Sequence, residues 1–254
     1  MDYLSKKFKQ IYVITIPRRK KRIKKVMKDM NINPIIYDAI LSKNLPSLEK
    51  LLEQKIINEE FIDNHLSYEG YPDKTIYEIE NEKLNSKRIT HIKGAIALYL
   101  SVIDILKKFI KSNEKYLLIF EDDIKPVNNI FKKNKQVKNI FINEIKNKNW
   151  DLINFGRCYD TSNSKYSKNL IKYTKPLCTH AMAYSRKVVK YILDNKLPMY
   201  NAYDQMFLKM IYLNEKFITF STVKPIFEQN FSYESQLGND LPKFATKYEL
   251  YLYK

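Results

Sequence analysis

Apolar residues in this chain follow two patterns, which predict strands and helices in turn. Short apolar runs, typical of strands buried on both faces, lie at 11–16, 35–40, 116–121 and 150–156. Apolar positions spaced three and four residues apart indicate amphipathic helices at 18–30 and 91–110. A strand, a helix and a strand in this order predict a βαβ unit. We therefore expect an α/β fold with a central, mostly parallel sheet flanked by helices.

The second half of the chain continues the alternation. Strands are predicted at 178–184 and 217–223, the latter continued by 225–227, and helices at 186–193 and 203–212. The segment near 42–88 has a weaker pattern and indicates an insertion on the sheet. Because no linker or internal repeat interrupts the chain, we expect residues 1–254 to form a single domain.

One stretch carries the clearest chemical signal. The predicted strand at 116–120 runs directly into Glu121, Asp122 and Asp123. Three adjacent carboxylates repel one another, and a divalent cation would remove that repulsion. In open α/β sheets, ligands bind at the carboxyl ends of the strands. The sequence therefore predicts a Mg²⁺ or Mn²⁺ site for a phosphorylated or nucleotide ligand, and the alternative is a solvated acidic turn.

The net charge of the chain indicates which classes of partner it can bind. The formal net charge is +17, from 45 basic and 28 acidic side chains, which favours anionic partners. The densest basic cluster, residues 18–22, is not interleaved with aromatic side chains as a single-strand nucleic-acid platform would be. We expect no nucleic-acid partner, while an anionic membrane surface is compatible with this charge. An AT-rich genome would produce the same lysine content.

The cysteines and the distribution of apolar residues indicate the cellular compartment of the protein. Cys158 and Cys178 match no zinc spacing and are predicted to be reduced thiols in the core. The first residues are polar and basic, with no apolar core of a secretory signal. No apolar run reaches the length of about 18 residues that a membrane-spanning helix needs. These features predict a cytoplasmic location.

Several motifs in order resemble glycosyltransferase family 25. Residues 14–22 resemble the family opening I-N-L-x-R-x-x-x-R, and the acidic triplet follows behind a similar apolar strand. Further positions that resemble family motifs are Gly94 with Ser101, residues 150–156, residues 180–186, Asp204, and Gln229 with Ser235. Thr15 stands where the family has Asn, and Val102 stands where it has His.

The resemblance implies a GT-A fold, a nucleotide-sugar donor and an inverting transfer assisted by Mn²⁺ or Mg²⁺. Residues 1–125 would form the donor-binding half and residues 126–254 the acceptor-side half. The metal ligands it implies are Asp123, Glu121 and His180. The positions expected to bind the donor are Thr15, Arg18, Arg22, Glu121, Asp122 and Gln229. For Arg18 and Arg22 the expectation also has a physical basis, since a guanidinium can bind a phosphate at two points. The alternative for both is a solvated start of a helix.

An inverting transfer needs a base near the acceptor hydroxyl. Asp204, at the start of a predicted helix, is the candidate, and Asp151 is the weaker one because it begins a strand. Each candidate has a structural alternative: Asp204 as an acid favoured by the helix dipole, and His180 as a hydrogen-bonded core residue. His65 and His91 receive no functional role.

The sequence thus predicts an enzyme that moves a sugar from a UDP-sugar to a hydroxyl of a glycan or protein. The alternatives are a basic metal-dependent nucleic-acid-binding protein or nuclease, and a glycosyltransferase-like binding module without activity. The donor sugar, the acceptor, the stereochemical outcome and the oligomeric state are not assigned by the sequence.

Overall fold

The computed structural model describes residues 2–68, 86–125, 127–157, 164–172 and 178–230. They divide into two compact units, each described by itself below. The first takes its described residues from 2–38, 105–194 and 207–230, and the second takes them from 39–104 and 195–206. The expected single domain of residues 1–254 stays a prediction.

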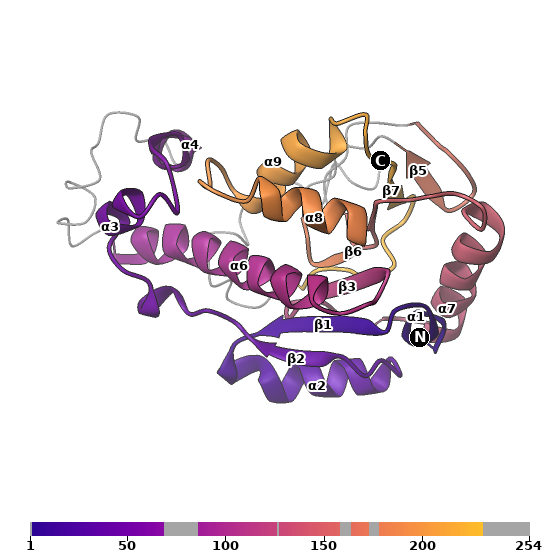
Figure 1. The fold of residues 1–254 in the computed structure, drawn as a ribbon. Coiled ribbons are helices and arrows are strands. Elements are labelled where there is room, and N and C mark those ends of the chain that lie inside the picture. The colour runs from indigo at the N-terminus through magenta and orange to yellow at the C-terminus, as the bar shows by residue number, and fades with distance from the viewer. Residues whose placement is uncertain (1, 69–85, 126, 158–163, 173–177, 231–254) are drawn as a thin grey trace. The chain divides into compact units, whose positions relative to one another are not determined.

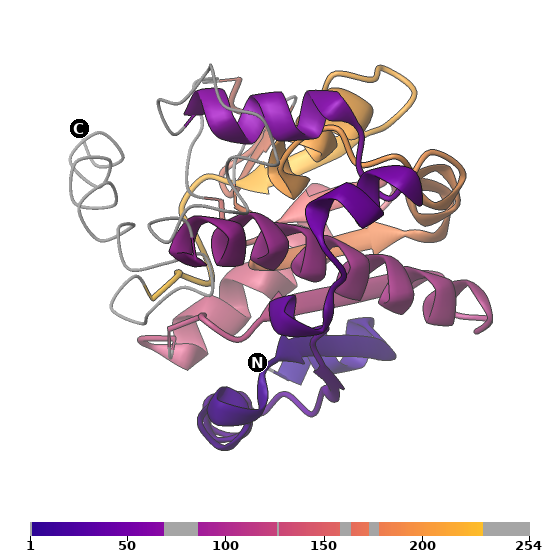
Figure 2. The same cartoon turned by 90° about the vertical axis from the view of Figure 1, so that its left-hand side faces the viewer.

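The first unit holds one sheet of seven strands among its described residues (Figures 1 and 2). Its strands are β1 (Gln10–Thr15), β2 (Ile35–Asp38), β3 (Tyr116–Glu121), β4 (Leu152–Asn154), β5 (Leu170–Lys172), β6 (Ala181–Ser185) and β7 (Thr219–Thr222). Its complete helices are α1 (Asp2–Lys7), the 3₁₀ turn η1 (Pro17–Arg19), α2 (Lys20–Asp29), α7 (Ile130–Asn139), the π-helix η4 (Ile140–Glu144), α8 (Arg186–Asp194) and the π-helix η5 (Leu208–Tyr212).

The sheet is mixed, with the strand order β2-β1-β3-β6-β4-β7-β5. β1 pairs in parallel with β2 and β3, and β4 pairs in parallel with β7. β6 runs antiparallel to both of its neighbours, β3 and β4, and β5 runs antiparallel to β7. The predicted α/β class is confirmed, with a mixed sheet where a mostly parallel one was expected. The antiparallel β6 matters for the site because its first residue lies at the edge where β3 ends.

The second unit is helical in its described part. It contains the 3₁₀ turn η2 (Ser42–Asn44), α3 (Leu48–Glu53) and α4 (Glu59–Tyr68). α6 (Ser86–Ile110) and α9 (Tyr203–Phe207) run from one unit into the other. Within this unit, the Ser101 hydroxyl of α6 accepts a hydrogen bond from Ile40 N at 2.9 Å and donates to Ala97 O at 2.7 Å. Ser101 is therefore a buried structural contact.

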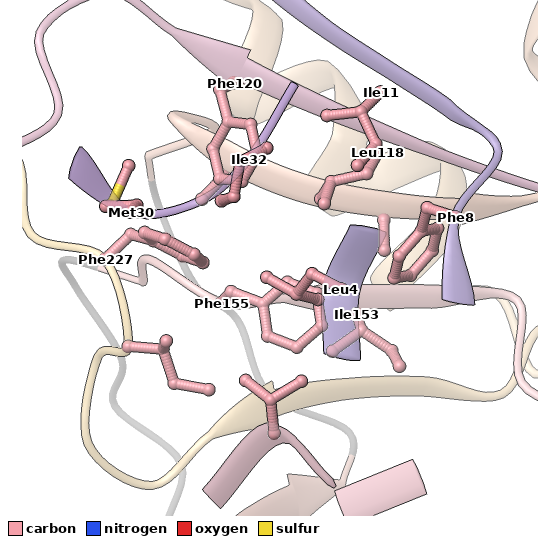
Figure 3. Packing of buried hydrophobic residues seen from close by; sticks show 14 of the residues in the cluster. Leu4, Phe8, Ile11, Met30, Ile32, Leu118, Phe120, Ile153, Phe155 and Phe227 are labelled. Atoms are coloured by element: carbon pink, nitrogen blue, oxygen red, sulfur yellow. The ribbon is translucent and has the colours of Figure 1, made fainter. Parts of the chain in front are cut away.

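One face of the sheet packs against α1, α2 and α7. Every second residue of β1 and β3 points to this side, as a period of two requires, and Figure 3 shows Ile11 and Leu118 among these side chains. The rings of Phe120 and Phe227 pack 4.8 Å apart. This contact joins the segment after β7 to the core beneath the end of β3.

Some boundaries differ from the prediction. The long helix begins at Ser86, five residues earlier than predicted, and α2 is preceded by a 3₁₀ turn that starts at Pro17. The strand predicted at 217–223 spans only Thr219–Thr222, and residues 225–227 do not continue it. Pro225 has no N–H for a ladder, and Ile226 N donates instead to Phe155 O at 2.8 Å. The short strand β5 was not predicted.

Candidate functional site

Four segments meet at one edge of the sheet in the first unit, namely the edge formed by the carboxyl ends of β1, β3 and β4. β1 and β3 are parallel neighbours, so Thr15 and Glu121 end at the same edge. β6 runs the other way, which brings His180, the residue before it, to this edge. β4 ends at Asn154, and Gly156 follows. The chain leaves β1 on one side to form β2 and returns on the other side to form β3, so this edge is a topological switch point, the usual ligand site of such sheets.

Asp122 holds the ends of β1 and β3 together. Its Oδ2 accepts hydrogen bonds from Thr15 Oγ1 at 2.8 Å and from Ile16 N at 3.1 Å. Its Oδ1 accepts from Arg19 Nη1 at 2.8 Å. The side chains of Arg19 and Asp122 are only 11% and 9% exposed, so this ion pair is buried. Both carboxylate oxygens of Asp122 are therefore engaged by the protein itself.

Arg22 fixes the backbone that follows the acids. Its guanidinium donates to Asp122 O at 2.5 Å and to Ile124 O at 2.8 Å. Arg22 therefore braces the acidic turn, whereas Arg18 lies exposed in η1. Arg19 was not predicted as a site residue, although it stands between the two arginines that were. The 3₁₀ turn that begins at Pro17 is what brings Arg19 to Asp122, and the run of five basic residues does not reveal it.

Asp123 is held by the segment after β7. Gln229 Nε2 donates to Asp123 Oδ2 at 2.7 Å, and Asn230 N donates to Asp123 O at 2.6 Å. Ile124 and Gln229 form an antiparallel bridge. The other oxygen, Asp123 Oδ1, is buried and has no hydrogen-bond partner among the described residues. A buried carboxylate oxygen without a partner is costly, and at this edge it marks a place for a ligand.

His180 is buried beside Asp123, with 1% of its surface exposed. Its Nε2 lies 3.1 Å from Phe227 O. A carbonyl oxygen can only accept, so Nε2 carries a proton. A Cβ at Gly156 would lie 2.1 Å from His180 Nε2, so only glycine fits under the ring.

Burial moves the pKa values of this pair in opposite directions. The pKa of Asp123 is raised above 3.8, chiefly because burial disfavours the charged carboxylate, with Asp122 adding to the effect. The pKa of His180 is lowered below 6.5, chiefly because burial disfavours the imidazolium, although the Asp123 charge opposes this. Both groups thus tend toward neutrality, and a cation beside them would favour the ionised carboxylate.

Glu121 is tied to the segment before β6. Its Oε1 accepts from Thr179 Oγ1 at 2.7 Å, and its N donates to His180 O at 3.1 Å. Thr179 had no signal in the sequence that would identify it. Among the described residues, no three His, Cys, Asp or Glu side chains are grouped to hold a metal ion. The predicted ligand set of Asp123, Glu121 and His180 therefore does not form a three-residue cluster.

The two candidate bases lie elsewhere. Asp204 is the second residue of α9 and belongs to the second unit, where its Oδ1 accepts from Gln205 N at 2.8 Å. Asp151 precedes β4 and is buried at the opposite edge of the sheet, as predicted. Its carboxylate accepts from Ser185 Oγ at 3.0 Å and from Ile218 N at 3.0 Å. Asp151 therefore has a structural role, because it connects the end of β6 to the residue before β7.

The sequence also singled out two cysteines, a serine and a valine. Cys178 is disulfide-bonded, so the prediction of two reduced thiols is wrong; Cys158, the only other cysteine in the sequence, lies outside the described residues. Ser235 also lies outside them. Val102 is buried in α6. No helix in the described ranges is long and apolar enough to cross a membrane.

The fold and the site define an α/β protein with an acidic strand end at the switch point of a mixed sheet. Residues 8–213 match glycosyltransferase family 25 (LPS biosynthesis protein), and the chain belongs to this family. The resemblance seen in the motifs is therefore confirmed, and family membership implies a glycosyltransferase that uses a sugar donor and an acceptor. A search of curated proteins found no match.

Proposed function

We propose that this chain transfers a sugar from a UDP-sugar to a hydroxyl of a glycan or protein, with inversion and with the help of Mn²⁺ or Mg²⁺. The observation that carries the proposal is the buried, unpartnered Asp123 Oδ1 at the switch-point edge. Family membership supports the transfer of a sugar, and this oxygen supports a cation at that edge.

The residues at the edge fit a metal that the protein holds at few points. Asp123 Oδ1, which has no hydrogen-bond partner among the described residues, is the first proposed ligand, and the neighbouring His180 is the second. Mg²⁺ and Mn²⁺ are commonly held by one or two protein ligands and completed by substrate phosphates. A carboxylate oxygen suits Mg²⁺ and Mn²⁺ alike. When bound, the ion would neutralise charge on the leaving nucleoside diphosphate.

The surrounding side chains keep this edge in position. Gln229 binds Asp123 Oδ2 and so leaves Oδ1 directed elsewhere. Thr15 and Arg19 hold Asp122, and Arg22 braces the turn between the acids. Such hydrogen bonds hold a metal-ligating side chain in its binding orientation before the metal is bound. We assign Thr15, Arg22 and Gln229 to positioning, whereas Arg18 and Glu121 are the side chains proposed to contact the donor.

Asp204 is the proposed base for the acceptor hydroxyl. It lies in the first turn of α9 and falls within residues 126–254, the half expected to face the acceptor. Its carboxylate would take the proton as the hydroxyl oxygen attacks the donor carbon, and the nucleoside diphosphate would leave on the opposite side.

Hydrolysis of UDP-sugars tests the proposal, since water replaces the acceptor. Release of UDP from UDP-galactose, UDP-glucose or UDP-N-acetylglucosamine is expected, with a dependence on Mn²⁺. Asp204→Asn is expected to keep UDP binding while it lowers UDP release by about 10²-fold or more. Family membership already favours this reaction over a nuclease. Mn²⁺-dependent UDP binding without any release would instead identify a binding module, and release that ignores Asp204→Asn would refute its role.

A further inference from the structure

A second candidate site lies in the first unit, away from the acids. An open pocket of about 780 Å³ is formed by α1, the end of α2 and the start of β2. Met27 and Ile32, which are 1% and 3% exposed, line it from the core side. Pockets of this size are typical of small-molecule sites.

Asn31 builds the wall of this pocket. It ends α2 in the left-handed conformation, with φ of 53°, which Asn tolerates well. Its side-chain Nδ2 donates to the Asp2 carboxylate, and its carbonyl accepts from Ser5 Oγ at 3.2 Å. α1 is thereby tied to the end of α2 at two points, so the pocket is a fixed feature of the fold.

Positive charge is concentrated around the pocket. Lys6, Lys9, Lys24 and Lys28 line it, against the single carboxylate of Asp2. All four lysines are exposed, and none has an ion pair with another residue in the ranges that the structure describes. Helix dipoles stabilise Lys6 and Lys28, which lie in last turns, but not Lys9 or Lys24. Four unpaired cations around one pocket are complementary to a multiply charged anion.

The pocket lies at the opposite edge of the sheet from the acids. Lys9 directly precedes β1, whereas Thr15, which contacts Asp122, ends it. β1 has six residues, and at about 3.3 Å per residue its ends are roughly 20 Å apart. A ligand in the pocket therefore does not occupy the donor site.

We propose that this pocket binds phosphate groups of an anionic ligand at a site separate from the sugar-donor site. Each phosphate brings up to two charges to compact lysine ammonium groups, which bind phosphate as point charges. The phosphate could belong to a soluble phosphorylated sugar or to a lipid headgroup, and the two arms of the experiment distinguish these sources. The site would anchor a remote part of a ligand rather than its reacting hydroxyl.

The test uses two double variants of the full chain that remove equal charge from the same helix. Lys24→Gln/Lys28→Gln alters the pocket, and Lys21→Gln/Lys25→Gln alters exposed positions of α2 outside it. Binding of inorganic pyrophosphate is measured by calorimetry with EDTA present. Co-sedimentation with phosphatidylcholine vesicles, with and without phosphatidylglycerol, is measured in parallel.

The pocket variant is expected to bind at least one of the two anionic probes about tenfold more weakly, while the control variant stays near the unaltered chain. Loss with pyrophosphate identifies a soluble phosphate ligand, and loss with vesicles alone identifies a lipid headgroup. Equal loss in both variants, or no binding by the unaltered chain, would overturn the proposal. Mn²⁺-dependent UDP binding is expected to be unchanged in the pocket variant, so failure here is separable from failure of the proposed function.

Discussion

Two neighbouring carboxylates should respond in opposite ways to the same substitution. Asp122→Asn removes the charge that faces Arg19 in a buried ion pair. The amide oxygen can still accept from Thr15 Oγ1 and Ile16 N, but Arg19 loses its counter-charge. Breaking such a pair costs about 3 kcal/mol of folding free energy, which lowers the midpoint of thermal unfolding by roughly 6–12 °C in a chain of this size.

Asp123→Asn removes a carboxylate that the fold does not satisfy. Gln229 still finds an acceptor oxygen in the new side chain. Because the pKa of Asp123 is raised in the folded state, its contribution to stability is present below about pH 3.8 and is lost as pH rises through the folded pKa. The variant removes that loss at neutral pH. We expect a gain of about 1 kcal/mol, or roughly 2–4 °C.

Differential scanning calorimetry of both variants in EDTA at neutral pH measures the contrast. Added Mn²⁺ with UDP should raise the unfolding midpoint of the unaltered chain but not that of Asp123→Asn. If Asp123→Asn destabilises the metal-free protein as much as Asp122→Asn, then both carboxylates are structural, and the reasoning from the unpartnered oxygen is refuted.

Three further predictions concern the same edge and the second unit. Gly156→Ala should cost about 1–3 kcal/mol in chemical denaturation and weaken Mn²⁺-dependent UDP binding, because the methyl group displaces His180; unchanged binding would contradict the fit of glycine under the ring. Ser101→Ala should cost about 1 kcal/mol through the lost contact with Ile40 N and leave UDP binding unchanged, whereas a selective loss of binding would give this serine a site role. Mn²⁺-dependent UDP binding, followed by calorimetry across pH, should weaken as pH falls, beginning above the usual carboxylate range because burial raises the pKa of Asp123; constant affinity down to about pH 4 would argue against this carboxylate as a ligand.

Much of the fold was predictable because the strands that form the site edge are continuous apolar runs. The runs that became β1 and β3 identified the buried strands, and the residues after them had to meet at one edge of the sheet. The strand β5 was missed because it has only three residues, and so short a run carries no periodicity.

That the protein itself would saturate Asp122 could not be predicted from the sequence. Asp122 and Asp123 are chemically identical, and their roles depend on partners more than 100 residues away in the sequence. Thr15 and Arg19 saturate Asp122, while Gln229 satisfies only one oxygen of Asp123. That an acid of this turn touches a metal stays a prediction, with Asp123 as the proposed ligand.

The position of His180 depends on strand direction, which the apolar pattern does not specify. In a wholly parallel sheet, a residue that precedes a strand would lie at the edge opposite the acids. Because β6 runs antiparallel to β3, His180 lies beside Asp123 instead.

Calorimetric titration of UDP tests the central claim most directly. The unaltered chain should bind UDP in the presence of Mn²⁺ and at least about tenfold more weakly in EDTA. Asp123→Asn should bind equally weakly in both conditions, while Asp29→Asn, an exposed acid at the end of α2, should behave like the unaltered chain. UDP binding that ignores both the metal and the substitution at Asp123 would contradict the proposed site.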